Sequence, residues 1–169
     1  MNSDFQKNPR LHTALRDWWK DLEDERSDRA QLRRAHDITA IILTPAYQRA
    51  YRRLCAAGWP VEADSPLNDR LAAIIGLLAH VKSDGDAPLV KAMSARKLGE
   101  DRPAVSPLRF QRLLESPDLD ALFTGLRRVL PLIQQPIGIA ALANDLLFWG
   151  DGVKKRWAYD YEWPAKKAE

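Results

Sequence analysis

Cysteine is nearly absent from this sequence of 169 residues, because Cys55 is the only one. A single thiol excludes an intrachain disulfide and any zinc site built from several cysteines. Cys55 falls on an apolar helical stripe, which favours a small core residue. A chain of this kind fits a reducing compartment, so we expect the protein to be cytoplasmic.

Long apolar runs are also missing, and the N-terminus lacks the basic-then-apolar pattern of a signal peptide. No apolar segment approaches the roughly 20 residues that a helix needs to cross a bilayer. Hydrophobic residues make up 46% of the chain and charged residues 29%, which is the balance of an ordinary folded protein. We therefore expect a packed protein that does not enter a membrane.

The residue clusters on which enzymes depend are scarce as well. His12, His36 and His80 fall in separate segments and form no pair with metal-ligand spacing. Residues 84–86 resemble a calcium loop only faintly, because no further ligands follow them. No phosphate-binding glycine loop occurs. The sequence therefore predicts no catalytic residue, no metal site and no cofactor, and so a protein that is not an enzyme.

Acidic residues gather between Asp17 and Asp28, and more than one interpretation is open. They could form a metal-binding surface. Such a run is more often a solvated helix face, which here would repel nucleic acid or meet a basic partner. We favour the second interpretation.

Apolar–polar alternation, which is typical of β-strands, is not found, whereas apolar residues recur every three or four positions. The helical stripes run from Leu11 to Leu22, Tyr47 to Leu54, Leu67 to Val81, Leu119 to Ile133 and Leu142 to Trp157. A hydroxyl residue followed by proline marks a helix start, and four such pairs occur, Thr44-Pro45, Ser65-Pro66, Ser106-Pro107 and Ser116-Pro117. We predict an all-α fold, a compact multi-helix bundle.

Residues 84–105 are rich in glycine and proline and could join two helical halves of this bundle. Leu89 to Met93 is expected to form a brief helix within them. We expect a single all-helical domain over residues 8–163, with residues 1–7 and 164–169 as flexible tails.

Charge is spread unevenly along the chain, although its formal net value is only +3. Met1 to Asp28 holds five Lys/Arg and seven Asp/Glu, a net of −2. Arg29 to Gly58 holds six arginines opposed only by Asp37. We expect a basic surface to begin in this second stretch.

Basic residues also cluster locally, as Arg33-Arg34, Arg52-Arg53, Arg109 with Arg112, Arg127-Arg128 and Lys154-Lys155-Arg156. On a helical wheel of about 100° per residue centred on Leu126, Arg127 lies on the flank and Arg128 almost opposite, so both are expected to face solvent or a partner. The planar guanidinium group suits two-point contact with phosphate. The pattern indicates salt-dependent nucleic-acid binding that is independent of sequence.

Several motifs follow one another in a recognisable order. They are a tryptophan helix over residues 15–22, RAQLRRA from Arg29, PAY from Pro45, VSPLRFQRLL from Val105, LRRVL from Leu126, DLLFWG from Asp145 and VKKRWA from Val153. In this order they resemble the CasB-type small subunit of Cascade, the type I-E CRISPR surveillance complex. The resemblance covers roughly Leu11 to Tyr161.

The resemblance implies a helical, non-catalytic subunit that is present as two copies beside the backbone and large subunits of the complex. It implies contact with guide RNA and target DNA, including the displaced single strand, and stabilisation of the R-loop that forms when the guide pairs with its target. The positions that it assigns to nucleic acid are Arg33, Arg34, Arg109, Arg112, Arg127 and Arg128, followed by Lys154, Lys155 and Arg156.

Arg52 and Arg53 are added to these nucleic-acid-binding residues on charge alone. Tyr159, Tyr161 and Trp163 could stack on unpaired bases, but packing within the protein is favoured for them.

Two other functions are consistent with the sequence. One is a purely structural helical adaptor whose arginines meet acidic protein partners. The other is a helix-turn-helix regulator, although the basic helices show no cluster of base-reading Asn or Gln side chains.

Overall fold

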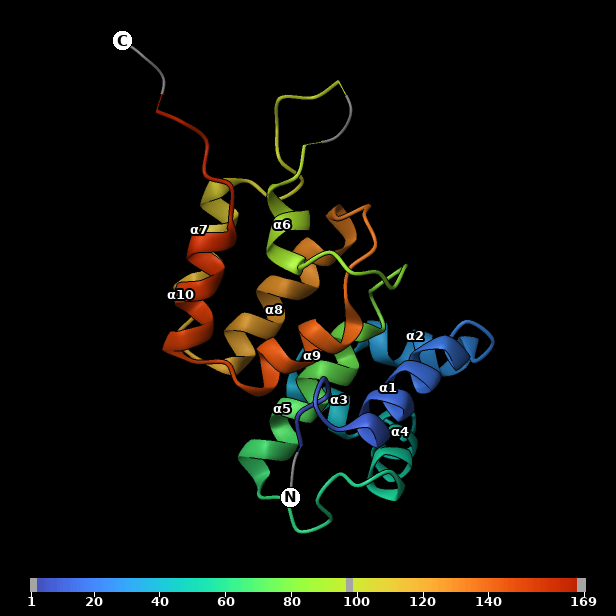
Figure 1. Cartoon of the computed structure of the whole chain (residues 1–169). Helices are drawn as coiled ribbons and strands as arrows, with labels where there is room; N and C mark the ends of the chain where they lie inside the picture. Colours follow the sequence, from blue (N-terminus) through green and yellow to red (C-terminus); the bar gives the residue numbers. More distant parts are fainter. Residues whose placement is uncertain (1–2, 97–98, 167–169) are drawn as a thin grey trace.

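The computed structural model describes residues 3–96 and 99–166, and all of its regular elements are helices (Figure 1). The elements are α1 (Pro9–Asp21), α2 (Arg26–Arg34), α3 (Ile38–Ile42), α4 (Pro45–Ala56), α5 (Ser65–Leu78), α6 (Leu89–Ser94), α7 (Pro107–Leu114), α8 (Leu119–Val129), the 3-10 turn η1 (Leu130–Leu132), α9 (Ile139–Leu147) and α10 (Asp151–Asp160). The predicted all-α fold is confirmed, and so is the brief helix at Leu89 to Met93.

The core is built around α5. Every residue of α5 from Leu71 to Leu78 is buried, because α3, α8 and α9 all pack against this helix. Gly76 allows the close packing, since a Cβ atom there would lie 2.6 Å from Cδ1 of Ile41 and 3.0 Å from Cε2 of Phe123. The two helical parts therefore share one continuous hydrophobic core, although α1–α5 and α6–α10 lie largely in the lower and upper parts of Figure 1.

Three of the four predicted helix starts are confirmed, because α4, α5 and α7 begin at Thr44-Pro45, Ser65-Pro66 and Ser106-Pro107. Thr44 caps α4 and Ser106 caps α7, each accepting from the backbone N–H three residues on. For α5 and α8 the cap is instead an aspartate, Asp64 or Asp118. A carboxylate forms a charge-assisted bond with the amide, so it replaces the nearby hydroxyl as the cap.

The N-terminal boundary differs from the expected one at residue 8. Phe5 is fully buried and stacks on Trp59 with ring centroids 5.8 Å apart. Its backbone N–H donates to Oδ1 of Asn144 at 2.8 Å. The packed part of the chain therefore includes Phe5, because an aromatic ring next to the first helix completes the core.

The C-terminal aromatic residues mostly pack within the protein. Tyr161 is buried, stacks on Phe110 at 4.2 Å and donates its hydroxyl to the carbonyl of Val105 at 2.6 Å. Trp163 meets Phe110 edge to face at 5.5 Å. Tyr159 is different, because 89% of it is exposed, so the packing interpretation is wrong for this residue. The other contacts hold α10 against α7.

None of the helices in the described ranges combines the length and the apolar character required to cross a bilayer. Residues 167–169, part of the expected C-terminal tail, lie outside the described residues.

Candidate nucleic-acid interface

The hollow between α7 and α8, here called the α7–α8 groove, is lined by three of the predicted arginines. Arg109 and Arg112 come from α7 and Arg128 from α8, around a volume of about 990 Å³. A Cβ atom on Gly125 would lie 2.6 Å from Cδ2 of Leu113, so glycine lets α8 approach α7 closely. The apolar part of the lining includes Leu113, Pro117, Ala121, Gly125, Val129 and Leu132.

The three arginines of the groove are available to an anion. Among residues 3–96 and 99–166, none of the three forms an ion pair with a carboxylate. Two acidic residues also line the groove, but Glu115 accepts from Gln111 at 3.2 Å and Asp120 accepts from the backbone N–H of Ile38 at 3.2 Å. The groove therefore joins an apolar floor to exposed guanidinium groups.

Arg127 and Arg33 lie elsewhere and already have partners. Arg127 donates through Nη2 to the carbonyl of Arg33 at 2.8 Å, and Arg33 donates through Nε to the carbonyl of Ala79 at 2.7 Å. The expectation that Arg127 faces solvent or a partner is only partly right, because its Nε atom is buried and has no hydrogen-bond partner among the described residues. The end of α2 covers this flank of α8, which a helical wheel cannot show.

His80 lies beside these two arginines. Burial, then the charges of Arg127 and Arg33, lower the pKa of His80 from 6.5 to about 4. Burial, then Arg29, lowers the pKa of Arg33 as well. Since His80 is neutral near pH 7, it adds no positive charge to this part of the surface.

The basic surface expected from Arg29 to Gly58 is partly neutralised by the acidic stretch before it. Arg53 pairs with Asp21 at 2.8 Å, and Arg49 pairs with Asp28. The acidic stretch therefore meets its basic partner within the chain, because α4 packs against α1 and α2. Arg52 is exposed, whereas assigning Arg53 to nucleic acid now conflicts with its bond to a carboxylate.

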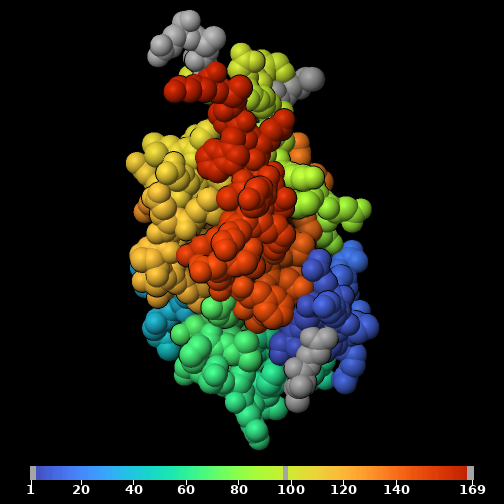
Figure 2. Space-filling model, turned by 60° about the vertical axis from the view of Figure 1, so that its left-hand side comes forward, coloured from blue at the N-terminus to red at the C-terminus, as the bar shows by residue number. Residues whose placement is uncertain are grey.

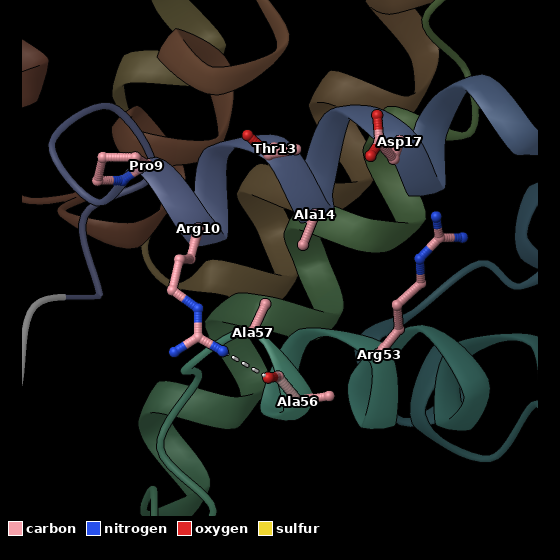
Figure 3. A pocket seen from close by; sticks show the side chains of 8 residues that line it. All are labelled: Pro9, Arg10, Thr13, Ala14, Asp17, Arg53, Ala56 and Ala57. Atoms are coloured by element: carbon pink, nitrogen blue, oxygen red, sulfur yellow. Dashed lines mark hydrogen bonds between the residues drawn. The ribbon is translucent and has the colours of Figure 1, made fainter.

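Figure 3 shows the shallow hollow between α1 and α4 beside this ion pair. Arg10 and Arg53 stand at its two ends, and Arg10 donates through Nη2 to the carbonyl of Ala56 at 3.1 Å. The floor between them is formed by small residues such as Ala14 and Ala57. Because both guanidinium groups are engaged, this hollow offers less free positive charge than the α7–α8 groove.

The basic triplet of α10 is divided among different surroundings. Arg156 pairs with Asp145, which also accepts from Nε1 of Trp157 at 2.8 Å. The Nζ atom of Lys154 lies 5.9 Å from the ring centroid of Trp149, and Lys155 is exposed. In Figure 2, α10 runs down the middle of the visible face, with α7 and α8 along its left edge.

The structure therefore brings together Arg109, Arg112 and Arg128, and it leaves the other predicted residues apart from them. Arg34 is exposed at the end of α2. No group of three or more His, Cys, Asp or Glu side chains in the described part of the chain is arranged to hold a metal ion.

Comparisons with known proteins agree with this architecture. Residues 28–161 match the protein family described as CRISPR-associated protein Cse2. A chain in the crystal structure of E. coli Cascade bound to a PAM-containing double-stranded DNA target superposes with a TM-score of 0.65 at 22% identity, covering 88% of this chain and 92% of that chain. No curated protein gives a significant sequence match.

Proposed function

This chain belongs to the Cse2 family of CRISPR-associated proteins, and from that we propose that it is a non-catalytic subunit of a Cascade-type surveillance complex in the cytoplasm. In this role it binds the sugar-phosphate backbone of guide RNA and target DNA without reading sequence, and it stabilises the R-loop, including the displaced strand. Its partners are the backbone and large subunits and a second copy of itself.

The observation that carries this proposal is the set of unpaired arginines in the α7–α8 groove. Arg109, Arg112 and Arg128 form no ion pair with any described carboxylate, so phosphate oxygens can replace water around their guanidinium groups. Contacts of this kind release counterions and depend little on sequence, which suits a subunit that serves any guide.

Modest contacts are sufficient for such a subunit. Replacing a DNA duplex by an RNA–DNA heteroduplex is close to balanced in free energy, so a few backbone contacts decide how long the open state persists. Each arginine then acts by holding the opened strands, and no covalent bond is made or broken.

The test is the lifetime of the R-loop in the assembled complex. The triple variant Arg109→Gln, Arg112→Gln, Arg128→Gln is expected to shorten this lifetime at least tenfold while the subunit still joins the complex. The matched control removes three exposed positive charges outside the groove, Arg26→Gln, Lys91→Gln and Arg102→Gln. Equal lifetimes for the two triple variants would contradict the proposal.

A structural adaptor is the second candidate, and the internal bonds of several arginines favour it. Arg53, Arg156 and Arg127 are all engaged within the chain, so they serve the fold itself. An adaptor predicts that the groove variant fails to join the complex, whereas a nucleic-acid-binding subunit predicts normal assembly with a shorter R-loop lifetime.

A further inference from the structure

A second basic hollow, here called the α2–α5 pocket, lies where the ends of α1 and α5 meet α2. It is lined by four cationic side chains, Lys20, Arg29, Arg33 and Lys82, and by one acidic side chain, Glu23. The end of α1 and the start of α2 lie at the right-hand edge of Figure 1. Of the four cations, only Arg33 was predicted from the sequence to bind nucleic acid.

The carbonyl groups at the end of α5 do not account for all four cations. The carbonyl of Leu78 accepts from Nε1 of Trp19 at 3.1 Å, and that of Ala79 accepts from Arg33 at 2.7 Å. Two carbonyls of the helix end are therefore already satisfied. Lys20 and Lys82 line the same pocket and have neither an ion pair nor a side-chain hydrogen bond within the described residues.

Two of the cations also repel each other. Arg29 and Arg33 are four residues apart on α2, where like charges are destabilising. Arg29 uses Nη2 to reach the carbonyl of Glu23 at 3.3 Å, and no described carboxylate lies within ion-pair distance of either guanidinium group. Glu23 lines the pocket but forms no ion pair with any of the four cations among the described residues, so an anion in the pocket would supply counter-charge at closer range.

We propose that the α2–α5 pocket binds one phosphate group, supplied by the backbone of a nucleic-acid strand. Its volume of about 180 Å³ equals that of roughly six water molecules at about 30 Å³ each. This space is large enough for a phosphate group of five heavy atoms. The strand as the source of the phosphate rests on the proposed function, while phosphate binding itself does not.

The pocket is also connected to the helix that carries part of the α7–α8 groove. Arg33 lines the pocket, and its carbonyl accepts the bond from Arg127 of α8. Arg128, the next residue of α8, lines the groove. A phosphate held at Arg33 therefore lies one hydrogen-bonded contact away from the helix that presents Arg128.

Inorganic phosphate tests the pocket in the isolated, full-length chain. Thermal unfolding is followed during a phosphate titration, with sodium chloride at matched ionic strength as reference. The melting temperature is expected to rise and saturate, as for a ligand that binds the folded state. The double variant Lys20→Gln, Lys82→Gln is expected to raise the apparent dissociation constant at least tenfold, and both residues are exposed, so the fold is retained.

Lys91→Gln is the control, since Lys91 is exposed on α6 and does not line the pocket. Phosphate also stabilises proteins by exclusion from their surface, and that effect neither saturates nor depends on two lysines. A rise that is linear in phosphate and equal in the wild type, the double variant and the control would overturn the proposal.

A single-stranded oligonucleotide identifies the source of the phosphate. The double variant is expected to bind it at least threefold more weakly than Lys91→Gln does. Unchanged oligonucleotide affinity in the double variant would overturn the strand as the source. If phosphate saturates the pocket but the wild-type chain binds no oligonucleotide, the proposed function fails while the phosphate site stands.

Discussion

Arg127 and Arg128 are neighbours in α8, yet their guanidinium groups have different surroundings. Arg127 is held by the carbonyl of Arg33, whereas Arg128 stands in the α7–α8 groove. Engaging Arg127 with phosphate would break a bond between α8 and α2. Arg128 loses only water, so we assign the nucleic-acid contact to Arg128 and a fold-stabilising bond to Arg127.

His80 makes the stability of the chain sensitive to acid. Its pKa is about 4 in the folded chain and 6.5 in the unfolded chain. At a pH between these two pKa values, His80 is therefore protonated in the unfolded state and neutral in the folded state. The free energy of unfolding therefore falls as the pH falls from about 6.5 to about 4. With a discount for partial exposure, the loss is on the order of 2 kcal/mol.

Urea unfolding at a series of pH values measures this loss. The variant His80→Gln is expected to flatten the pH dependence over the interval between about pH 4 and pH 6.5. An equal slope for the wild type and His80→Gln would show that other groups cause the acid sensitivity.

The helical wheel placed Arg128 away from the buried stripe of its own helix, and the structure gives it a groove shared with Arg109 and Arg112. The same method could not find the partners of Arg53 or Arg156. Those partners, Asp21 and Asp145, lie on other helices, and their positions follow only from tertiary packing. Helical periodicity gives the direction of a side chain, but not the residue that it meets.

Helix α5 lies within the predicted stripe from Leu67 to Val81, and the structure buries its residues from Leu71 to Leu78 on every side, as in a helix at the centre of a core. The break between α9 and α10 was less clear, since one apolar stripe runs from Leu142 to Trp157. The structure ends α9 at Leu147 and begins α10 at Asp151. Gly150 stands at this break, and Arg70 of α5 also contacts it, a long-range contact that no local pattern reveals.

Arg70 holds the end of α9 through three hydrogen bonds. Its Nη1 atom lies 3.1, 3.0 and 3.1 Å from the carbonyl oxygens of Leu146, Leu147 and Trp149. Arg70→Ala is expected to lower the free energy of unfolding by about 2 kcal/mol and the melting temperature by about 4–8 °C, because the half-buried carbonyls lose a charged donor. Calorimetry or thermal circular dichroism measures the change.

Arg26→Ala is the matched control, since Arg26 is exposed on α2 and makes no ion pair with a described residue. Its effect should stay within about 0.5 kcal/mol, as for most surface substitutions. If both variants melt at the same temperature, Arg70 does not stabilise the turn between α9 and α10.

Across the whole molecule, the uneven charge of the sequence is partly cancelled by folding. The acidic N-terminal stretch and the arginines of α4 meet in the pairs Asp21–Arg53 and Asp28–Arg49. Unpaired positive charge is left at the α7–α8 groove and the α2–α5 pocket. The net charge of +3 therefore understates the local positive charge that a polyanion meets at the groove and the pocket.

Salt dependence measures how many phosphates the groove neutralises. For single strands, the logarithm of the binding constant falls with the logarithm of salt concentration by about 0.7 for each phosphate contact. The variant Arg112→Gln, Arg128→Gln should therefore reduce this slope by about 1.4. Fluorescence anisotropy of a labelled oligonucleotide between low and moderate salt gives both slopes.

The double variant Arg26→Gln, Lys91→Gln is the control. It distinguishes a local phosphate contact from a general electrostatic attraction. It changes the net charge by the same amount at exposed positions outside the groove. If phosphates bind at Arg112 and Arg128, this control keeps the wild-type slope, because distant charges are screened beyond about 10 Å at 0.1 M salt. Equal reductions in the two double variants would mean that the strand responds to total charge, and the groove would lose its assigned role.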